Sequence, residues 1–226
     1  MAYSVHLSQE HDDETLFFAE FEGGQKRLTI DIEIGGQLMR GRSLEGCLAF
    51  GIRVPSQLMA AVPTRIVVQP RKRGPLPDFG VGPWGGWYLV SKEFVEIVER
   101  LEPGIHQFLP IPETIDPTGR QLDKKYFLMN ILKRVNAVDV ERSTVRIDQK
   151  GYFASINNRS VNTTVEFMTF LPGKQVLALR KLSINGLHLW RGIPQDIVGV
   201  GFSDELYEAV RTADLSSLDY LYAVEV

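Results

Sequence analysis

The chain has 226 residues, of which 44% are hydrophobic, and a formal net charge of −3 at pH 7. This composition is typical of a folded globular protein and excludes wholesale disorder, while the slight acidity argues against general nucleic-acid binding. The single cysteine, Cys47, excludes an internal disulfide and a cysteine-rich metal site.

The first 25 residues contain acidic side chains but no lysine or arginine. We interpret this end either as a solvated surface or as a negative face that steers a basic protein partner. The acidic residues proposed to contact such a partner are Glu10, Asp12, Asp13 and Glu14. No secretory signal and no membrane-spanning run is predicted, so we expect a cytoplasmic protein.

Alternating apolar residues predict strands in the N-terminal region. Residues 28–34 (LTIDIEI) alternate, and residues 16–34 are interpreted as a hairpin or two meander strands. Residues 64–69 (TRIVVQ) are another strand candidate. Residues 70–86 are rich in proline and glycine, which indicates a long surface loop or a boundary. The boundary would separate an N-terminal β-rich region, 1–70, from a C-terminal α+β region, 71–226, unless the two form one continuous domain.

The loop at residues 70–86 carries two further candidate contacts. Arg71, Lys72 and Arg73 form a basic patch that is too small to indicate nucleic-acid binding. Trp84 is either an anchor in an interface, where tryptophan is enriched, or a core side chain.

Residues 87–111 predict a strand, a helix and a second strand. Ser91 is placed to cap the helix, and Pro103-Gly104 is placed to end it. The pattern recurs 112 residues later, where Ser203 aligns with Ser91 and Leu206 with Phe94. We therefore predict two similar strand-helix-strand units, at about 87–111 and 199–225, produced by a structural repeat or by convergent helix capping.

Between these units the strand-like stretches are KYFLMNIL, TVRID, GYFASI, QVLALR and SINGLHLW. Many strands, few helices and no regular alternation between them predict an α+β fold with a mostly antiparallel sheet.

No sequence motif indicates catalysis. The four histidines lack the spacing of metal ligands, and Cys47 lies among apolar residues that favour burial. The stretch GVGFS, residues 199–203, precedes a helix but lacks the glycine and lysine pattern of phosphate loops. We predict that the chain is not an enzyme and that it uses no metal and no cofactor.

Three stretches, in this order, carry a family resemblance: YLVSKEFVEIVERLEPGIHQFLPI, YFLMNILKRVNAVDVERS, and LHLWRG followed by GFSDELYEAV. They resemble the immunity proteins of bacterial polymorphic toxin systems, in a family marked by a tryptophan and an arginine. The resemblance covers about residues 80–226. It places the two marker residues at Trp190 and Arg191, in a structural or a toxin-contacting role. The residues themselves suggest a strand-end tryptophan with a surface arginine stacked on it or paired with a carboxylate.

The resemblance implies a protein that binds and neutralises a toxin encoded next to it, by stoichiometric protein–protein inhibition in the cytosol. Neither nucleic acid nor membrane is expected as a partner, and the chain is expected to be a monomer or homodimer. Two alternatives stay open: a small-molecule-binding protein or enzyme with a cleft between the N-terminal sheet and the C-terminal core, and a structural protein of a secretion apparatus.

Overall fold

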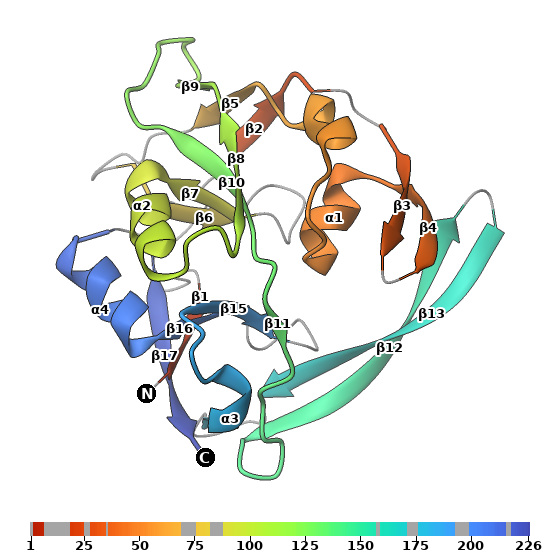
Figure 1. Ribbon diagram of the computed structural model, residues 1–226, viewed down its shortest axis with the longest axis vertical. Helices are drawn as coiled ribbons and strands as arrows, with labels where there is room; N and C mark the ends of the chain where they lie inside the picture. The colour runs from red at the N-terminus through yellow and green to blue at the C-terminus, as the bar shows by residue number, and fades with distance from the viewer. Residues whose placement is uncertain are drawn as a thin grey trace. The chain divides into compact units, whose positions relative to one another are not determined.

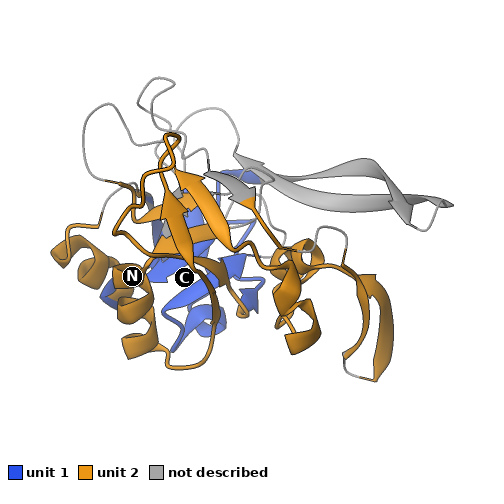
Figure 2. Cartoon of the chain, turned by 90° about the horizontal axis from the view of Figure 1, so that it is seen from above, with its two compact units in different colours: residues 1–6, 134–205, 220–226 blue, residues 7–133, 206–219 orange. Residues whose placement is uncertain are grey.

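A computed structural model describes residues 2–6, 19–24, 28–34, 36–68, 76–81, 88–156, 159–170, 176–192, 199–215 and 218–226. The chain forms two compact units, each assembled from separate stretches (Figure 2). Unit 1 comprises Met1–His6, Arg134–Glu205 and Tyr220–Val226, and unit 2 comprises Leu7–Lys133 and Leu206–Asp219. The division of the chain at residue 70 stays a prediction.

Unit 2 is built around a four-stranded antiparallel sheet in the order β6-β7-β10-β8 (Figure 1). Its strands are β6 (Phe79–Val81), β7 (Tyr88–Ser91), β10 (Tyr126–Asn130) and β8 (Gln107–Ile111). Helix α2 (Lys92–Leu101) covers the face that carries Phe79, because the rings of Phe79 and Phe94 meet edge to face at 5.5 Å. Leu89, Leu109 and Leu128 lie on the opposite face and share a buried core with helix α1 (Leu44–Phe50).

Smaller elements complete unit 2. Strands β2 (Ala19–Glu22), β5 (Arg65–Val68) and β9 (Glu113–Ile115) form a three-stranded sheet, β3 (Ile30–Ile34) pairs with β4 (Gln37–Arg42), and η1 (Ser56–Ala61) is a 3₁₀ helix. The strands expected at residues 28–34 and 64–69 are therefore present. The hairpin expected over residues 16–34 is wrong, since β2 pairs with β5 and β3 pairs with β4.

Unit 1 contains a six-stranded sheet in the order β11-β15-β16-β1-β17-β14. Its strands are β11 (Arg134–Val135), β15 (Leu189–Gly192), β16 (Val200–Ser203), β1 (Ala2–His6), β17 (Asp219–Glu225) and β14 (Leu177–Leu179). The parallel pairs are formed by the edge strands β11 and β14. The unit also contains the long antiparallel ribbon β12 (Val145–Ile156)–β13 (Arg159–Phe170), visible in Figure 1, and the short helix α3 (Lys181–Ile184). Helix α4 (Asp204–Thr212) follows β16, and its residues from Leu206 onward belong to unit 2.

Helix α2 begins and ends where the sequence predicts. The Ser91 hydroxyl accepts a hydrogen bond from the Phe94 backbone N–H at 3.3 Å, which satisfies a donor that the first helical turn leaves unpaired. Beyond the last turn, Gly104 adopts a positive φ of 69°, a conformation that glycine adopts at little cost.

The two predicted strand-helix-strand units share one topology. In the first, β10 is inserted between β7 and β8, and in the second, β1 is inserted between β16 and β17. The registers correspond as well, because Ser91 lies opposite Tyr126 and Ser203 lies opposite Ala2. The α+β prediction with two similar units is confirmed, and the matching inserted strands favour a structural repeat over convergent capping.

Three features differ from the sequence expectation. TVRID and GYFASI are parts of one continuous strand, β12, because the intervening Gln149-Lys150-Gly151 continues the pairing with β13. The first part of SINGLHLW belongs to helix α3 and the adjoining turn, and strand β15 begins only at Leu189. Strands β1 and β13 and helix α1 were not predicted.

Candidate partner-binding site

Most of the predicted contact residues lie outside the described part of the chain. These are Glu10, Asp12, Asp13, Glu14, Arg71, Lys72, Arg73 and Trp84. The structure does place Trp190 and Arg191, which are adjacent in strand β15 of unit 1.

Trp190 is 0% exposed and belongs to the buried core of unit 1. It lies opposite Gly201 in the pairing of β15 with β16, and a Cβ atom at Gly201 would overlap Trp190 Cε2, Nε1 and Cζ2. All three atoms are neighbours in the indole ring and lie close to the same position, that of the added Cβ. The face of the indole therefore covers Gly201. Gly201, in the stretch GVGFS, therefore leaves room for the Trp190 ring. This packing role agrees with the absence of a phosphate-loop pattern in GVGFS.

Arg191 lies on the other face of the sheet from Trp190, because neighbouring residues of a strand point to opposite sides. It is 7% exposed, and its backbone lies beside that of Arg134 in the parallel pairing of β15 with β11. The expectation of a surface arginine stacked on Trp190 is therefore wrong.

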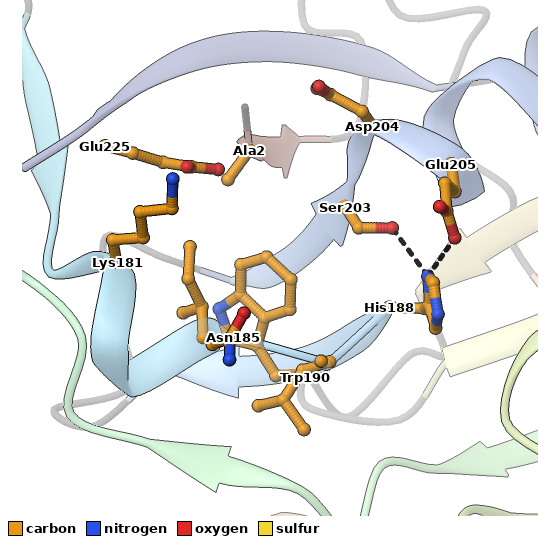
Figure 3. Close-up of a pocket in the computed structure, with 12 residues that line it drawn as sticks. Ala2, Lys181, Asn185, His188, Trp190, Ser203, Asp204, Glu205 and Glu225 are labelled. Atoms are coloured by element: carbon orange, nitrogen blue, oxygen red, sulfur yellow. Dashed lines mark hydrogen bonds and ion pairs between the residues drawn. The ribbon is translucent and has the colours of Figure 1, made fainter.

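A pocket of about 360 Å³ opens in unit 1 on the side of the sheet that carries Trp190 (Figure 3). Its walls come from α3 and the turn after it, from β15, from the β16–α4 junction, and from β1 and β17. The lining residues are Ala2, Lys181, Ile184, Asn185, Gly186, Leu187, His188, Trp190, Ser203, Asp204, Glu205 and Glu225. Figure 3 shows Lys181 and Glu225 at one end of the pocket and His188, Ser203 and Glu205 at the other.

A histidine, a serine and a carboxylate meet at the second end of this pocket. His188 Nδ1 lies 2.9 Å from Ser203 Oγ and 3.4 Å from Glu205 Oε2. The contact with Glu205 is an ion pair when the imidazole is protonated, and the tautomer of His188 determines which group donates in the contact with Ser203. In a nucleophilic triad the serine and the acid occupy different ring nitrogens. Here both contact Nδ1, so the three groups do not have the geometry of that triad.

The charge of the pocket is predominantly negative. Asp204 and Glu205 from α4 and Glu225 from β17 contribute three carboxylates, and Lys181 contributes one ammonium group. At the centre, Trp190 Nε1 is buried without a hydrogen-bond partner among the described residues. Leu182, which follows Lys181 in α3, is 94% exposed.

Neither a cluster of metal ligands nor a membrane-spanning helix occurs among the described residues. No group of three or more histidine, cysteine, aspartate or glutamate side chains in the described ranges is arranged to hold a metal ion. Among the helices that the structure describes, none has the length and apolar character needed to cross a bilayer.

Comparison with known proteins identifies the family. The profile described as the Immunity protein family (Imm11) matches residues 39–225, which is most of the chain. The chain therefore belongs to this immunity protein family. The match begins at residue 39, well before residue 80 where the sequence resemblance began, and so includes much of unit 2. No curated protein matches the chain.

Sequence reasoning did not find the pocket, because its lining residues come from separate stretches of the chain that are brought together by strand pairing. Of the contact residues predicted from the sequence, only Trp190 lines the pocket. The pairing of Ser203 with His188 carries no local signal, since neither residue stands in a recognisable motif. The alignment of Ser203 with Ser91 was the one sequence signal at this site, and it indicated only that a helix begins after Ser203.

Proposed function

We propose that the protein is an immunity protein that binds its cognate toxin stoichiometrically and neutralises it in the cytosol of the producing cell. The observation that carries the proposal is the family match over residues 39–225. The toxin is proposed to be encoded next to this chain, and the chain to act as a monomer or homodimer without a cofactor.

The site geometry supports binding rather than catalysis. Ser203 and Glu205 contact the same nitrogen of His188, whereas in a nucleophilic triad the serine and the acid occupy different ring nitrogens. The lining of the pocket in unit 1 combines charged groups with the apolar residues Ile184, Leu187 and Trp190. Protein interfaces have this composition, with an apolar contact area and a polar margin.

An inhibitor of this kind needs an interface of the usual size for a specific complex, about 1,600 Å² in total. The pocket supplies only part of such an area. The acidic group Glu10, Asp12, Asp13 and Glu14, the basic group Arg71, Lys72 and Arg73, and Trp84 stay proposed contacts beyond it. Charges of both signs on one inhibitor would steer and orient its encounter with the toxin.

The proposal is tested by growth of a bacterial host that expresses the neighbouring gene, with and without this chain. We expect the neighbour to stop growth, the chain to restore it, and the two proteins to co-purify as a complex of fixed stoichiometry. A catalytically inactive variant of the neighbour should still form the complex. Killing that continues despite high levels of folded chain, or rescue without any complex, contradicts stoichiometric inhibition.

A further inference from the structure

Helices α2 and α4 lie next to each other (Figure 1), and a groove of about 420 Å³ runs between them. It belongs wholly to unit 2 and shares no residue with the pocket of unit 1. The lining residues are Ile97, Arg100, Glu208, Ala209, Thr212 and Ala213. The groove is open to solvent, because all of these except Ile97 and Ala209 are exposed.

The structural repeat accounts for the groove, because α4 and the residue after it carry small side chains where α2 carries large ones. At the offset of 112 residues, the corresponding pairs are Ile97 and Ala209, Arg100 and Thr212, and Leu101 and Ala213. Packed helices normally fill the space between them as densely as a crystal of small molecules. The difference between the two copies therefore leaves apolar surface of α2 uncovered.

The floor of the groove is apolar. Ile97 is 6% exposed, and Ile97, Ala209 and Ala213 have purely hydrocarbon side chains. An apolar group that enters the groove would therefore be removed from water without burying an unpaired polar group. The lining covers only residues 97–100 and 208–213, a short stretch that can receive one or two side chains in the manner of a knob entering a hole between helices.

Arg100 gives the groove a positive charge. Its guanidinium forms no hydrogen bond or ion pair with any residue that the structure describes. Glu208 is the one acid in the lining, and its Oε2 atom already accepts from Arg211 Nε at 3.0 Å and from Arg211 Nη2 at 2.6 Å. The complementary group is therefore an apolar side chain with a carboxylate beside it.

The openness of the groove favours a protein over a small molecule as the source of these groups. A small ligand is held in a concave site that encloses most of its surface and orients it by several polar contacts. This groove has exposed residues on both walls, Arg100 on α2 and Thr212 on α4. The surface of a partner protein would close it, as the margin of an interface closes around an anchor side chain.

We propose that the groove between α2 and α4 receives a large apolar side chain of a partner protein, and that a carboxylate next to this side chain pairs with Arg100. The identity of the partner as the toxin rests on the proposed function. Side chains that fill pockets, together with arginines, account for most of the binding energy of many interfaces.

The first test fills the groove. Ala209→Ile introduces the side chain that the repeat carries at Ile97, and it should weaken the toxin complex at least about tenfold without lowering the unfolding midpoint. Ala209→Ser is the matched control, since it leaves the groove open and should bind as the wild type does. Ala213→Leu introduces the side chain found at Leu101 and keeps the test decisive if Ala209→Ile does not fold. Folded, filled variants that bind the toxin as tightly as the wild type overturn the proposal.

The second test removes the charge. Arg100→Gln should weaken the toxin complex several-fold and reduce the salt dependence of its affinity, because the pairing carboxylate loses its cation. Lys92→Gln is the matched control: Lys92 is exposed on the same helix, pairs with Glu96 at 3.1 Å and does not line the groove. Equal effects of the two substitutions overturn the pairing with Arg100.

The third test asks whether the two contacts belong to one site. The loss for Ala209→Ile/Arg100→Gln should be smaller than the sum of the single losses, because filling the groove displaces the anchor and the carboxylate together. Fully additive losses contradict a shared site. If every variant binds and neutralises the toxin as the wild type does, the groove is overturned and the proposed function stands. If the toxin does not bind the wild-type chain, the proposed function fails, and the assignment of the groove to the toxin fails with it.

Discussion

At the scale of single residues, Gly201 and Trp190 show how one position determines another. The indole lies where a side chain at position 201 would be, so the glycine is required by its cross-strand neighbour. The tryptophan in turn covers a part of the strand that has no side chain of its own. Trp190 also lines the pocket of unit 1.

The first prediction concerns Gly201→Ala. The added methyl group would overlap the indole and force Trp190 out of its position, at a cost of about 1–3 kcal/mol. Urea unfolding measures this loss, with Gly46→Ala as control, because a Cβ at Gly46 would meet only ordinary contacts in helix α1. In a Trp190→Ala background the cost of Gly201→Ala should fall, since the overlapping ring is gone. Equal costs in both backgrounds would contradict the overlap.

Asp116 shows a different single-residue effect, in a turn of unit 2. Its Oδ1 atom accepts hydrogen bonds from Thr118 Oγ1 at 2.6 Å, from the Thr118 N–H at 2.9 Å and from the Arg120 N–H at 3.0 Å. The Thr118 hydroxyl is the main cause that lowers the pKa of Asp116 from its ordinary 3.8 to about 2, against an opposing effect of burial. The charged carboxylate is therefore favoured in the folded state.

The second prediction follows from the sign of that shift. The pKa of Asp116 is lower in the folded state, so its contribution to stability is complete above about pH 4 and is lost as the pH falls toward 2. The stability difference between the wild type and Asp116→Asn should shrink over that interval. Thr118→Val should raise the pKa of Asp116 toward 3.8, as measured by NMR titration of the carboxyl carbon. An Asp116 that titrates normally in the wild type contradicts the hydrogen-bonding account.

At the scale of elements, the repeated strand-helix-strand unit places a serine at the same position twice. Ser91 and Ser203 each end a strand and immediately precede a helix. In the first copy the hydroxyl caps α2, whereas in the second it contacts His188 Nδ1 in the pocket. The same residue type at the same position thus takes part in a cap in one copy and in a candidate site in the other.

The third prediction is that Ser91→Ala destabilises the fold by about 1 kcal/mol, because the Phe94 N–H loses its acceptor. Ser43→Ala at helix α1 is the matched comparison, since Ser43 Oγ accepts from the Gly46 N–H at 3.2 Å. Ser91 is buried and Ser43 is partly exposed, so water can replace the lost bond only at Ser43. Thermal unfolding should show the larger loss for Ser91→Ala, and the reverse order would argue against the buried cap.

Elements were predictable from the sequence where local patterning is strong. Helix α2 has a cap, an apolar face and a glycine stop, and β3 and β5 contain alternating or branched residues, so each carries its own signal. Helix α1 is only seven residues long, and β13 (RSVNTTVEFMTF) begins with mostly polar residues, so neither presents a clear period.

The candidate site was predictable only at Trp190. The position of the pocket depends on which strands become neighbours, and local sequence does not determine that choice. The pairing of β1 with β16 brings Ala2 into the pocket wall from the far end of the chain. Two acidic pocket residues, Glu205 and Glu225, look like ordinary surface residues until the fold brings them together.

At the scale of the whole molecule, the position of β1 is the most consequential feature of unit 1. The strand lies inside the sheet, with β16 on one side and β17 on the other. It therefore closes a sheet whose other strands come from the second half of the sequence. Proline is poorly tolerated inside such a sheet, because it removes a ladder donor.

The fourth prediction is that Ser4→Pro unfolds unit 1, whereas Ser4→Ala is tolerated. Ser4 pairs with Gly201 in the middle of β1, and the substitution should cost at least about 3 kcal/mol. Hydrogen exchange should accelerate in β16 and β17 and change less in β7 and β10, since unit 2 has a hydrophobic core of its own. Equal loss of protection in both units would show that they do not fold separately.

The position of β1 also has a consequence for the timing of biosynthesis. Val5 pairs with Val200, so strand β1 must wait for a partner strand that is synthesised about 195 residues later. Unit 2 draws mainly on an early stretch and can begin folding while synthesis continues. A nascent or prematurely terminated chain that ends before β16 would therefore lack the pocket. Under the proposed function, only chains synthesised as far as β17 would protect the cell, so protection would lag behind the synthesis of β1 by the time needed to complete and close the sheet.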